Sequence, residues 1–366
     1  MSPAETQYFT LLRAALWDKP VDNVSDVDWK SVMKMAVHHG NNVLLSDVAV
    51  RMEGKGKPSE KMLSRMQSYL RGNLLSQMRL RQILSSAVSL LREHKIEPVV
   101  LKGFGLALLY PNPSLRQFGD VDLFVGLDHF HEACDLLRTL PGGYNWGNRV
   151  DSGKHFNIEF GEYPMEIHRV SAEVNDPKGA KTYAAIERDG LYNNPQRVDM
   201  EGLEISLPSK EFMVFFTFFH AWHHFLTSGV GWRQISDVAM ALHAYHGQLD
   251  LEKLRQWLTE MQLMKPWQVF GYLMVEYLGL PQTEMPFYEA KSHRTAQRLY
   301  CNVTQTGNFR RNSRFKQRHP KNKWMHKLHS FIGVFVDFLY RARVFPSEAF
   351  REMRHSFGMA LKKMGK

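Results

Sequence analysis

The chain is poor in cysteine and lacks the long apolar segments of secreted or membrane-spanning proteins. Its two cysteines, Cys134 and Cys301, lie far apart without metal-ligand spacing, which excludes a disulfide framework. No apolar segment follows Met1, and the longest membrane-like stretch, 331–340, contains Asp337 and is too short to cross a bilayer. We therefore expect a cytoplasmic protein with no transmembrane segment.

Two familiar motifs are incomplete. The turn 103–105 resembles a dinucleotide-binding loop, but its third glycine is replaced by Leu108. His220 and His224 stand one helical turn apart, as in zinc metalloproteases, but Ala221 occupies the position of the required glutamate. We reject both motifs and expect the two histidines to hydrogen-bond within their helix or to line a cleft.

Acidic residues are absent from the most basic part of the chain. The formal net charge is +10, and the segment 310–327 carries eight lysines and arginines without an acid. Such a run is typical of a solvated loop or of a contact with a polyanion or an anionic membrane surface. The aromatic residues nearby suit peripheral membrane contact and docking on the protein's own core equally, and we favour docking on the core.

Paired carboxylates are the most informative feature that is present. Asp120 and Asp122 are separated by one apolar residue and run into Leu-Phe-Val, a pattern typical of a β-strand. Residues i and i+2 of a strand point to the same face, so the two carboxylates project together. Two adjacent anions repel unless a cation lies between them, and Mg²⁺ prefers such oxygen ligands together with phosphates. The pair predicts a metal site for phosphoryl or nucleotidyl transfer.

A phosphate-binding turn is predicted before this strand. A buried strand over 96–101 leads into Lys102 and Gly103, and a helix over 106–110 follows. A glycine turn between a strand and a helix lets backbone N–H groups approach phosphate. Lys102 and Arg116 are candidates to meet phosphate oxygens. The alternatives are a solvated side chain for Lys102 and a salt bridge with a carboxylate for Arg116.

A third carboxylate is expected on a hairpin formed by strands over 155–160 and 163–170. In the second strand Glu166 and His168 share one face. Sheet pairing would bring Glu166 to the first two carboxylates. Three other acids compete for this role: Asp151, Glu159 and Glu162.

Helical patterns flank this mixed segment. Apolar spacing predicts helices over 6–17, 29–52, 60–95, 211–226, 232–245, 251–263 and 266–278. We therefore expect an α+β protein with an N-terminal helical region (1–95), a core (96–207) and a C-terminal helical region (208–366). Arg233 and Asp237 belong to the predicted cleft wall or pair with each other along one helix face.

The motifs together resemble the uncharacterised nucleotidyltransferase family of the polymerase-β-type superfamily. The similarity extends over most of the chain, from about Trp29 into the C-terminal third, and rests on Leu101-Lys102-Gly103, Tyr110-Pro111, Arg116, Gly119-Asp120-Val121-Asp122-Leu123, Glu166-Ile167-His168, His220, His224, Gly231-Trp232-Arg233, Asp237 and Gly307-Asn308-Phe309. One departure is the turn Lys102-Gly103-Phe104, where the superfamily usually has Gly-Ser or Gly-Gly.

The resemblance implies a polymerase-β-like core, a small mixed sheet with helices. It also implies that Asp120, Asp122 and Glu166 hold Mg²⁺ or Mn²⁺. The nucleotide would be bound by Lys102, Gly103, Arg116 and Gly119, and the cleft would include His168, His220, His224 and Arg233. We therefore expect transfer of a nucleoside monophosphate from a nucleoside triphosphate to a hydroxyl-bearing acceptor, with release of pyrophosphate.

The acceptor is open, although a small molecule or protein is favoured over RNA because no RNA-binding module is recognised. The alternative is a non-catalytic regulatory protein that keeps the fold and binds nucleotide or a polyanion. Retention of three candidate acids argues against it, because a mere scaffold has no need to hold several anions together.

Overall fold

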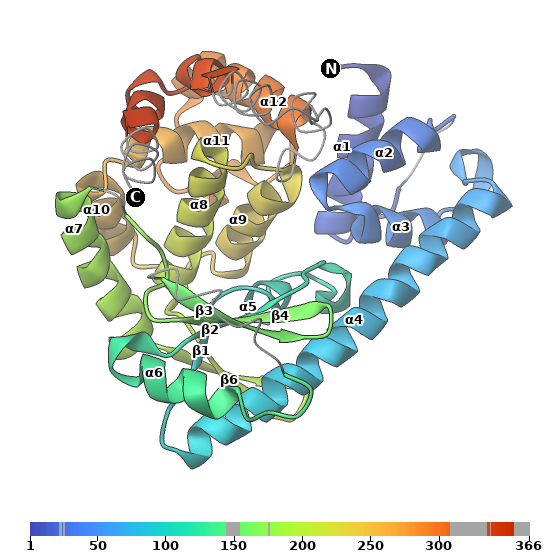
Figure 1. Cartoon of the computed structure of the whole chain (residues 1–366). Helices are drawn as coiled ribbons and strands as arrows, with labels where there is room; N and C mark the ends of the chain where they lie inside the picture. Colours follow the sequence, from blue (N-terminus) through green and yellow to red (C-terminus); the bar gives the residue numbers. More distant parts are fainter. Residues whose placement is uncertain are drawn as a thin grey trace, which may run out of the picture.

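A six-stranded mixed sheet lies among helices in the computed structural model (Figure 1). The structure describes residues 1–21, 24, 26–143, 154–174, 176–307, 335–336 and 338–354. The chain is mostly helical, and the predicted α+β class is confirmed. The basic segment 310–327 lies outside the described residues.

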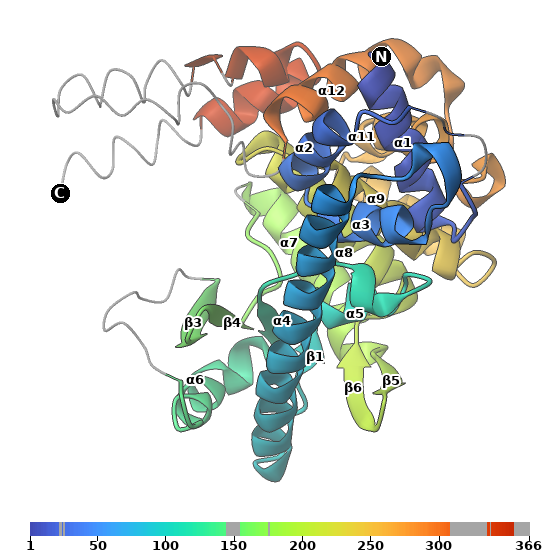
Figure 2. The ribbon, with the colours of Figure 1, turned by 90° about the vertical axis from the view of Figure 1, so that its right-hand side faces the viewer.

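The strand order of the sheet is β3-β4-β2-β1-β6-β5. Its strands are β1 (Val99–Val100), β2 (Val121–Phe124), β3 (His155–Phe160), β4 (Tyr163–His168), β5 (Gln196–Met200) and β6 (Leu203–Leu207). β2 is parallel to β4 and antiparallel to β1, and β1 is parallel to β6. The hairpins β3–β4 and β5–β6 form the two opposite edges (Figure 2). The parallel pairing of β2 with β4 is what brings distant polar side chains together below.

The N-terminal region forms four helices, α1 (Pro3–Leu16), α2 (Trp29–His39), α3 (Asn42–Arg51) and α4 (Glu60–Glu93). The single pattern predicted over 29–52 is wrong, because Gly40 ends α2 in the left-handed conformation (φ 76°) and a side chain there would be strained. The predicted long helix is α4, which runs from α3 past the sheet and contacts β2 and α6 (Gly126–Leu137) (Figure 1).

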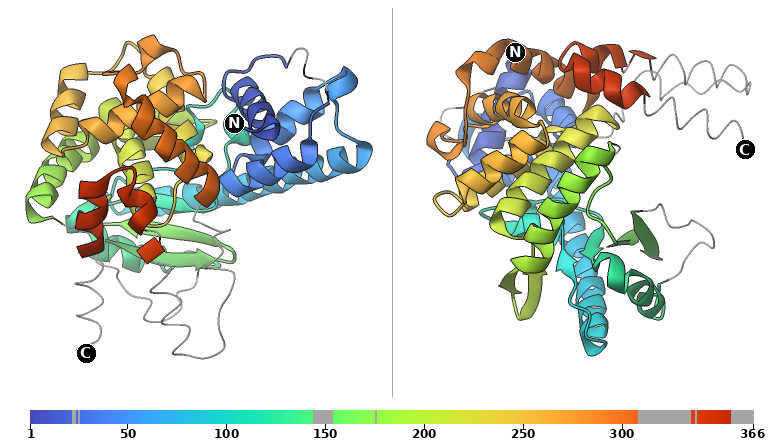
Figure 3. Two further views of the ribbon diagram at one scale, coloured as in Figure 1. Left: turned by 90° about the horizontal axis from the view of Figure 1, so that it is seen from above. Right: turned by 90° about the vertical axis from the view of Figure 1, so that its left-hand side faces the viewer.

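The C-terminal region contributes α8 (Lys210–Leu226), α9 (Trp232–Ala244), α10 (Leu251–Glu260), α11 (Met264–Glu276) and α12 (His293–Thr306). The first four match the predicted helices closely. Trp232 of α9 is fully buried and its ring lies 4.7 Å from that of Phe9 of α1. The N- and C-terminal helices therefore share a core, and Figure 3 shows them side by side over the sheet. In the described part of the chain, no helix is both long and apolar enough to cross a membrane.

Several predicted boundaries need correction. The strand expected over 96–101 is only β1, and the helix expected over 106–110 is the single turn α5 (Phe104–Ala107), because the chain enters the loop before Pro111. Elements without a specific prediction are α7 (Pro177–Glu187), α12, β5, β6 and the short helices η1 (Gly54–Gly56), η2 (Pro113–Leu115), η3 (Arg188–Asn193), η4 (Gln282–Glu284) and η5 (Ala290–Ser292).

Candidate active site

A cavity of about 680 Å³ collects almost all of the predicted site residues. Its lining includes Lys102, Gly103, Arg116, Gly119, Asp120, Asp122, Glu166, His220, His224 and Arg233. The walls come from the junction of α2 and α3, the turn after β1, the loop before β2, β4, and helices α8 and α9. His168 is the exception, because it is buried beneath the carboxylates and does not reach the cavity lining.

The pairing of β2 with β4 brings the carboxylates of the site close to one another. Asp122 is the direct register partner of Glu166, and Asp120 immediately precedes β2. Their apolar neighbours Val121 and Met165 are buried in the core, as the alternation of a strand requires. The side chain of Asp122 is 0% exposed and that of Glu166 is 24% exposed. Of the competing acids, Glu159 and Glu162 do not line the cavity, and Asp151 lies outside the described residues.

Asp122 is held by two cationic or hydrogen-bonding partners. Lys102 Nζ lies 2.9 Å from Asp122 Oδ1, and His168 Nε2 lies 2.9 Å from the same oxygen. Burial opposes ionisation of Asp122, but these two partners outweigh it and move its pKa far below the usual range. The second oxygen, Oδ2, is buried and has no hydrogen-bond partner among the described residues. Lys102 is therefore not a solvated side chain but the counter-ion of the acidic strand.

The pKa values of the other two carboxylates, Asp120 and Glu166, shift in opposite directions. Burial and the charge of Asp122 raise the pKa of Asp120. For Glu166 burial acts in the same direction, but the hydrogen bond with His168 and the charge of Lys102 outweigh it and lower the pKa. His168 Nε2 lies 3.4 Å from Glu166 Oε2, so one imidazole bridges β2 and β4.

Arg116 does not extend into the cavity as a free phosphate ligand. Its Nε and Nη2 donate to the two oxygens of Asp237 at 2.8 and 2.9 Å, and both side chains are buried. Burial opposes the charge of Arg116, but Asp237 raises its pKa. This is the salt bridge considered as the alternative for Arg116, and it replaces the pairing of Arg233 with Asp237 considered along α9.

Arg116 also fixes the turn after β1. Its Nη1 donates to the carbonyl oxygen of Gly103 at 3.1 Å. Gly103 has φ 55° and ψ −107°, and a Cβ there would lie 3.3 Å from Cδ2 of Phe118. Only glycine adopts this conformation without strain. The ion pair between the loop and α9 thereby positions the turn that carries Lys102.

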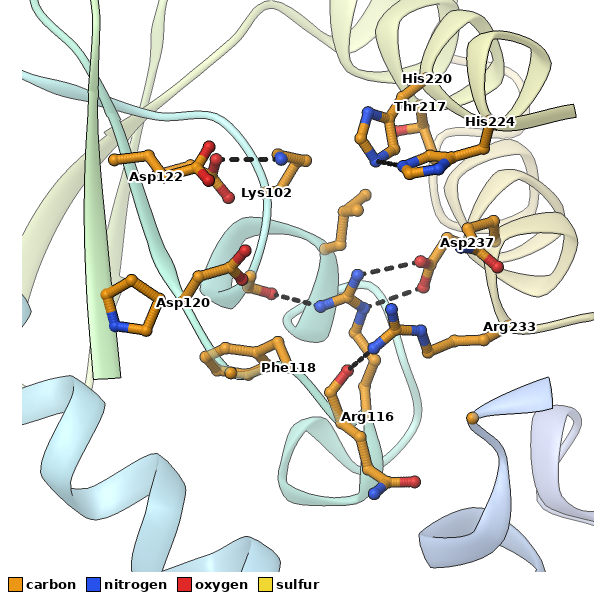
Figure 4. A pocket seen from close by; sticks show the side chains of 18 of the residues that line it. Lys102, Arg116, Phe118, Asp120, Asp122, Thr217, His220, His224, Arg233 and Asp237 are labelled. Atoms are coloured by element: carbon orange, nitrogen blue, oxygen red, sulfur yellow. Dashed lines mark hydrogen bonds and ion pairs between the residues drawn. The ribbon is translucent and has the colours of Figure 1, made fainter. Parts of the chain in front are cut away.

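Histidines form much of the helical wall (Figure 4). His220 Nε2 and His224 Nε2 are 3.0 Å apart, and His224 Nδ1 lies 2.6 Å from Ser228 Oγ. Burial lowers the pKa of both histidines, that of His224 to about 3. Both imidazoles are therefore neutral near pH 7, as expected for histidines that bond within their helix and line a cleft. Arg233 donates from Nη1 to the carbonyl oxygen of Gln117 at 2.8 Å.

A metal ion has a suitable donor set here. Besides the three carboxylates, His155 of β3 brings an imidazole beside Glu166, and ligand atoms of His155, Glu166 and His168 lie within 4.8 Å of one another. Hard divalent cations take carboxylate oxygens, and Mn²⁺ follows the same preference. Sequence reasoning did not assign His155, although it alternates on the same strand face as Asn157, the register partner of Glu166.

Other lining residues were also missed. They are Val37, His38, Gly40 and Asn42 near the N-terminus, Leu106, Gln117 and Phe118, Lys154 and Pro164, and Thr217, His223 and Gln234 from the helical wall. Asp237 lines the cavity, as expected for a residue of the predicted cleft wall. The N-terminal residues carry no local motif, and only tertiary packing brings the junction of α2 and α3 to the cavity.

Comparison with known proteins gives one match. The sequence profile of a family described as uncharacterised nucleotidyltransferase matches residues 25–279, which include every carboxylate discussed above. Neither the curated proteins nor the solved structures contain a significant match.

Proposed function

The chain belongs to the uncharacterised nucleotidyltransferase family, and from this premise we propose that it moves a nucleoside monophosphate from a nucleoside triphosphate to a hydroxyl-bearing small molecule or protein side chain, releasing pyrophosphate. The core over 96–207 would then be polymerase-β-like. The observation that carries the proposal is the cross-strand pairing of Asp122 with Glu166, with Asp120 alongside, at the wall of a cavity.

The donor set fits Mg²⁺ or Mn²⁺. Asp122 Oδ2 is a buried oxygen that accepts no hydrogen bond from the part of the chain that the structure describes, and an unsatisfied buried acceptor is costly unless a ligand completes it. Asp120, Asp122 and Glu166 would hold the metal. Such an ion neutralises phosphate charge and lowers the pKa of an acceptor hydroxyl.

The protein's own groups bind and orient the reactants. Lys102 would exchange part of its ion pair with Asp122 for the phosphates of the nucleotide. The acceptor oxygen forms a bond to the α-phosphorus, the bond from that phosphorus to the β-phosphate oxygen breaks, and pyrophosphate leaves in line. The hydroxyl proton passes to Glu166, because its side chain is partly exposed whereas that of Asp122 is not.

The direct test measures metal-dependent turnover. Purified protein is incubated with labelled nucleoside triphosphates, Mg²⁺ or Mn²⁺ and a cell extract as the source of acceptor, and both pyrophosphate and labelled product are followed. We expect Asp120→Asn and Asp122→Asn each to reduce pyrophosphate release by about 1,000-fold, as for loss of a group that stabilises the transition state.

Glu162→Gln is the matched control, because Glu162 is an exposed acid in the β3–β4 turn that does not line the cavity. Retained turnover in both aspartate variants would rule out the assigned metal site. Tight nucleotide binding by the wild type without any product would instead support the regulatory, non-catalytic alternative.

A further inference from the structure

Arg233 is a cation in the cavity wall that makes no direct ion pair with a described residue. Its Nη1 donates to a backbone carbonyl, and its Nε is buried without a hydrogen-bond partner among the described residues. Among the described residues no carboxylate forms an ion pair with it, because the nearby Asp237 is engaged by Arg116 and Tyr110. Burial and the charge of Arg116 lower the pKa of Arg233, and the charges of Asp237 and Asp120 offset this shift only in part. A sheltered guanidinium with a buried, unpartnered N–H is costly to keep unless an anion joins it.

Arg233 stands where the main cavity meets a second pocket of about 390 Å³. The two share Asn42, Gln117, Phe118 and Arg233. The rest of the second pocket is a stretch of α4 with hydroxyl, amide and aromatic groups, namely Ser68, Tyr69, Gly72, Asn73 and Ser76. In this second lining Arg233 is the single charged side chain. A molecule lying across Arg233 can therefore place an uncharged polar part along α4.

The cations of the cavity fall on two sides of the pocket. Lys102 contacts Asp122, and Lys154 precedes β3, where burial and the charge of Lys102 lower its pKa while Asp122 and Glu166 oppose this shift. Arg233 lies instead with Arg116 and Asp237 on the other side of the pocket (Figure 4). In-line transfer requires the acceptor and the leaving pyrophosphate on opposite sides of the α-phosphorus. The two lysines, Lys102 and Lys154, suit the side of the leaving pyrophosphate. Arg233 therefore lies on the side of the acceptor.

We propose that Arg233 binds an oxyanion of the acceptor, which is a small hydroxyl compound that carries a phosphate or carboxylate group. This inference rests on the proposed nucleotidyl transfer and defines its acceptor. A planar guanidinium binds such groups through two parallel N–H donors. The acceptor's hydroxyl takes the nucleotidyl group and loses its proton to Glu166, while Arg233 positions it and takes no part in the bond changes.

No carboxylate of the described cavity lining is available to pair with a cationic acceptor. Within the described lining the carboxylates are Asp120, Asp122, Glu166 and Asp237. The first three are assigned to the metal, and both oxygens of Asp237 already accept hydrogen bonds from Arg116 or Tyr110. Amines and polyamines are therefore disfavoured relative to an anionic hydroxyl compound.

The test uses calorimetry on the full chain with two probes. An α,β-methylene nucleoside triphosphate with Mg²⁺ reports the nucleotide site, and inorganic phosphate added to the nucleotide-saturated protein reports the acceptor anion. Wild type, Arg233→Met, Arg233→Lys and the control Arg79→Met are compared, because Arg79 is exposed on α4 outside both pockets.

We expect Arg233→Met to weaken phosphate binding by about tenfold or more while nucleotide affinity changes by less than about threefold, because a charge-assisted contact is lost only on the acceptor side. Arg233→Lys should retain part of the phosphate affinity, and Arg79→Met all of it. If phosphate fails to bind the nucleotide complex, or if Arg233→Met weakens nucleotide as strongly as phosphate, Arg233 does not bind an acceptor oxyanion. Absence of Mg²⁺-dependent nucleotide binding by the wild type would instead count against the proposed function.

Discussion

At the residue scale, the site depends on how a few buried charges are compensated. Asp122 is fully buried, yet it stays ionised because Lys102 and His168 both contact its Oδ1. Arg116 and Asp237 form a second buried pair that holds the Gly103 turn. Removing one partner of a buried pair leaves the other charge uncompensated, which costs more than the pair itself contributes.

The pair of Arg116 with Asp237 gives the first prediction. Arg116→Met should lower the free energy of unfolding by about 3–5 kcal/mol, because Asp237 would remain buried without its cation. The double variant Arg116→Met with Asp237→Leu should recover part of this loss, although Tyr110 also loses its acceptor. Urea denaturation measures both. A single variant as stable as wild type, or a double variant less stable than the single one, would contradict this account.

The sequence predicted which side chains share one face of a strand, but it did not predict which side chains form ion pairs. The period of two residues in a strand put Glu166 and His168 on one face, and the register with Asp122 bears this out. Arg116 and Asp237 are 121 positions apart, so no local pattern links them. The local candidate, Arg233 one helical turn from Asp237, was the wrong partner because the loop before β2 delivers Arg116 to the same carboxylate.

At the scale of single elements, the turn after β1 has the strictest backbone requirement. Gly103→Ala should cost about 1–2 kcal/mol of stability through its positive φ. It should also weaken Mg²⁺–nucleotide affinity, because the new Cβ presses on Phe118 and shifts Lys102. Gly247→Ala is the matched control, since Gly247 has φ 73° with no atom within 4 Å of the added Cβ. Calorimetry with the methylene analogue should separate the two variants; equal nucleotide affinity in both would refute a role for this turn in binding.

Helices were easier to predict than strands. The amphipathic period located α8 to α11 to within a few residues, because that signal is local. The sequence did not predict β5 and β6 as separate strands. Their side chains alternate between the two faces of the hairpin, and Glu201 and Gly202 in the turn between them both have positive φ. Alternation over five residues is weak evidence, and pairing of β6 with β1 depends on a contact 107 positions away.

At the scale of the whole molecule, the buried His39 packs between an N-terminal helix and a C-terminal helix. The ring of His39 is fully buried, 5.9 Å from that of Tyr8 and 6.5 Å from that of Trp232. Neither ring nitrogen has a hydrogen-bond partner in the described part of the chain. Burial, and to a lesser degree the charge of His38, moves the pKa of His39 well below its usual value. The folded protein therefore keeps this imidazole neutral.

This predicts a loss of stability in mild acid. Below about pH 6.5 the unfolded chain protonates His39 while the folded protein does not, so the unfolded state binds more protons and stability falls as the pH falls. Between pH 7 and pH 5 the contribution of His39 should be about 2 kcal/mol. His39→Phe should show a correspondingly smaller decrease in urea unfolding experiments. The same pH dependence in both proteins would show that His39 is not responsible.

The cavity itself is a property of the whole chain. The N-terminal helices, the mixed core and helices α8 and α9 each supply part of its lining. The sequence predicted which residues of the sheet wall line the cavity, because paired carboxylates and a glycine turn are local motifs. It did not predict the junction of α2 and α3, or the pocket along α4, because both reach the cavity through contacts between segments far apart in the sequence.

Manganese binding measured by electron paramagnetic resonance tests the central claim most directly. With the methylene nucleotide analogue present, wild-type protein and the Glu162→Gln control should bind Mn²⁺ alike. Asp120→Asn, Asp122→Asn and Glu166→Gln should each weaken Mn²⁺ binding by about tenfold or more, as expected for loss of a carboxylate ligand. Unchanged Mn²⁺ affinity in all three variants would mean that these carboxylates do not form a metal site.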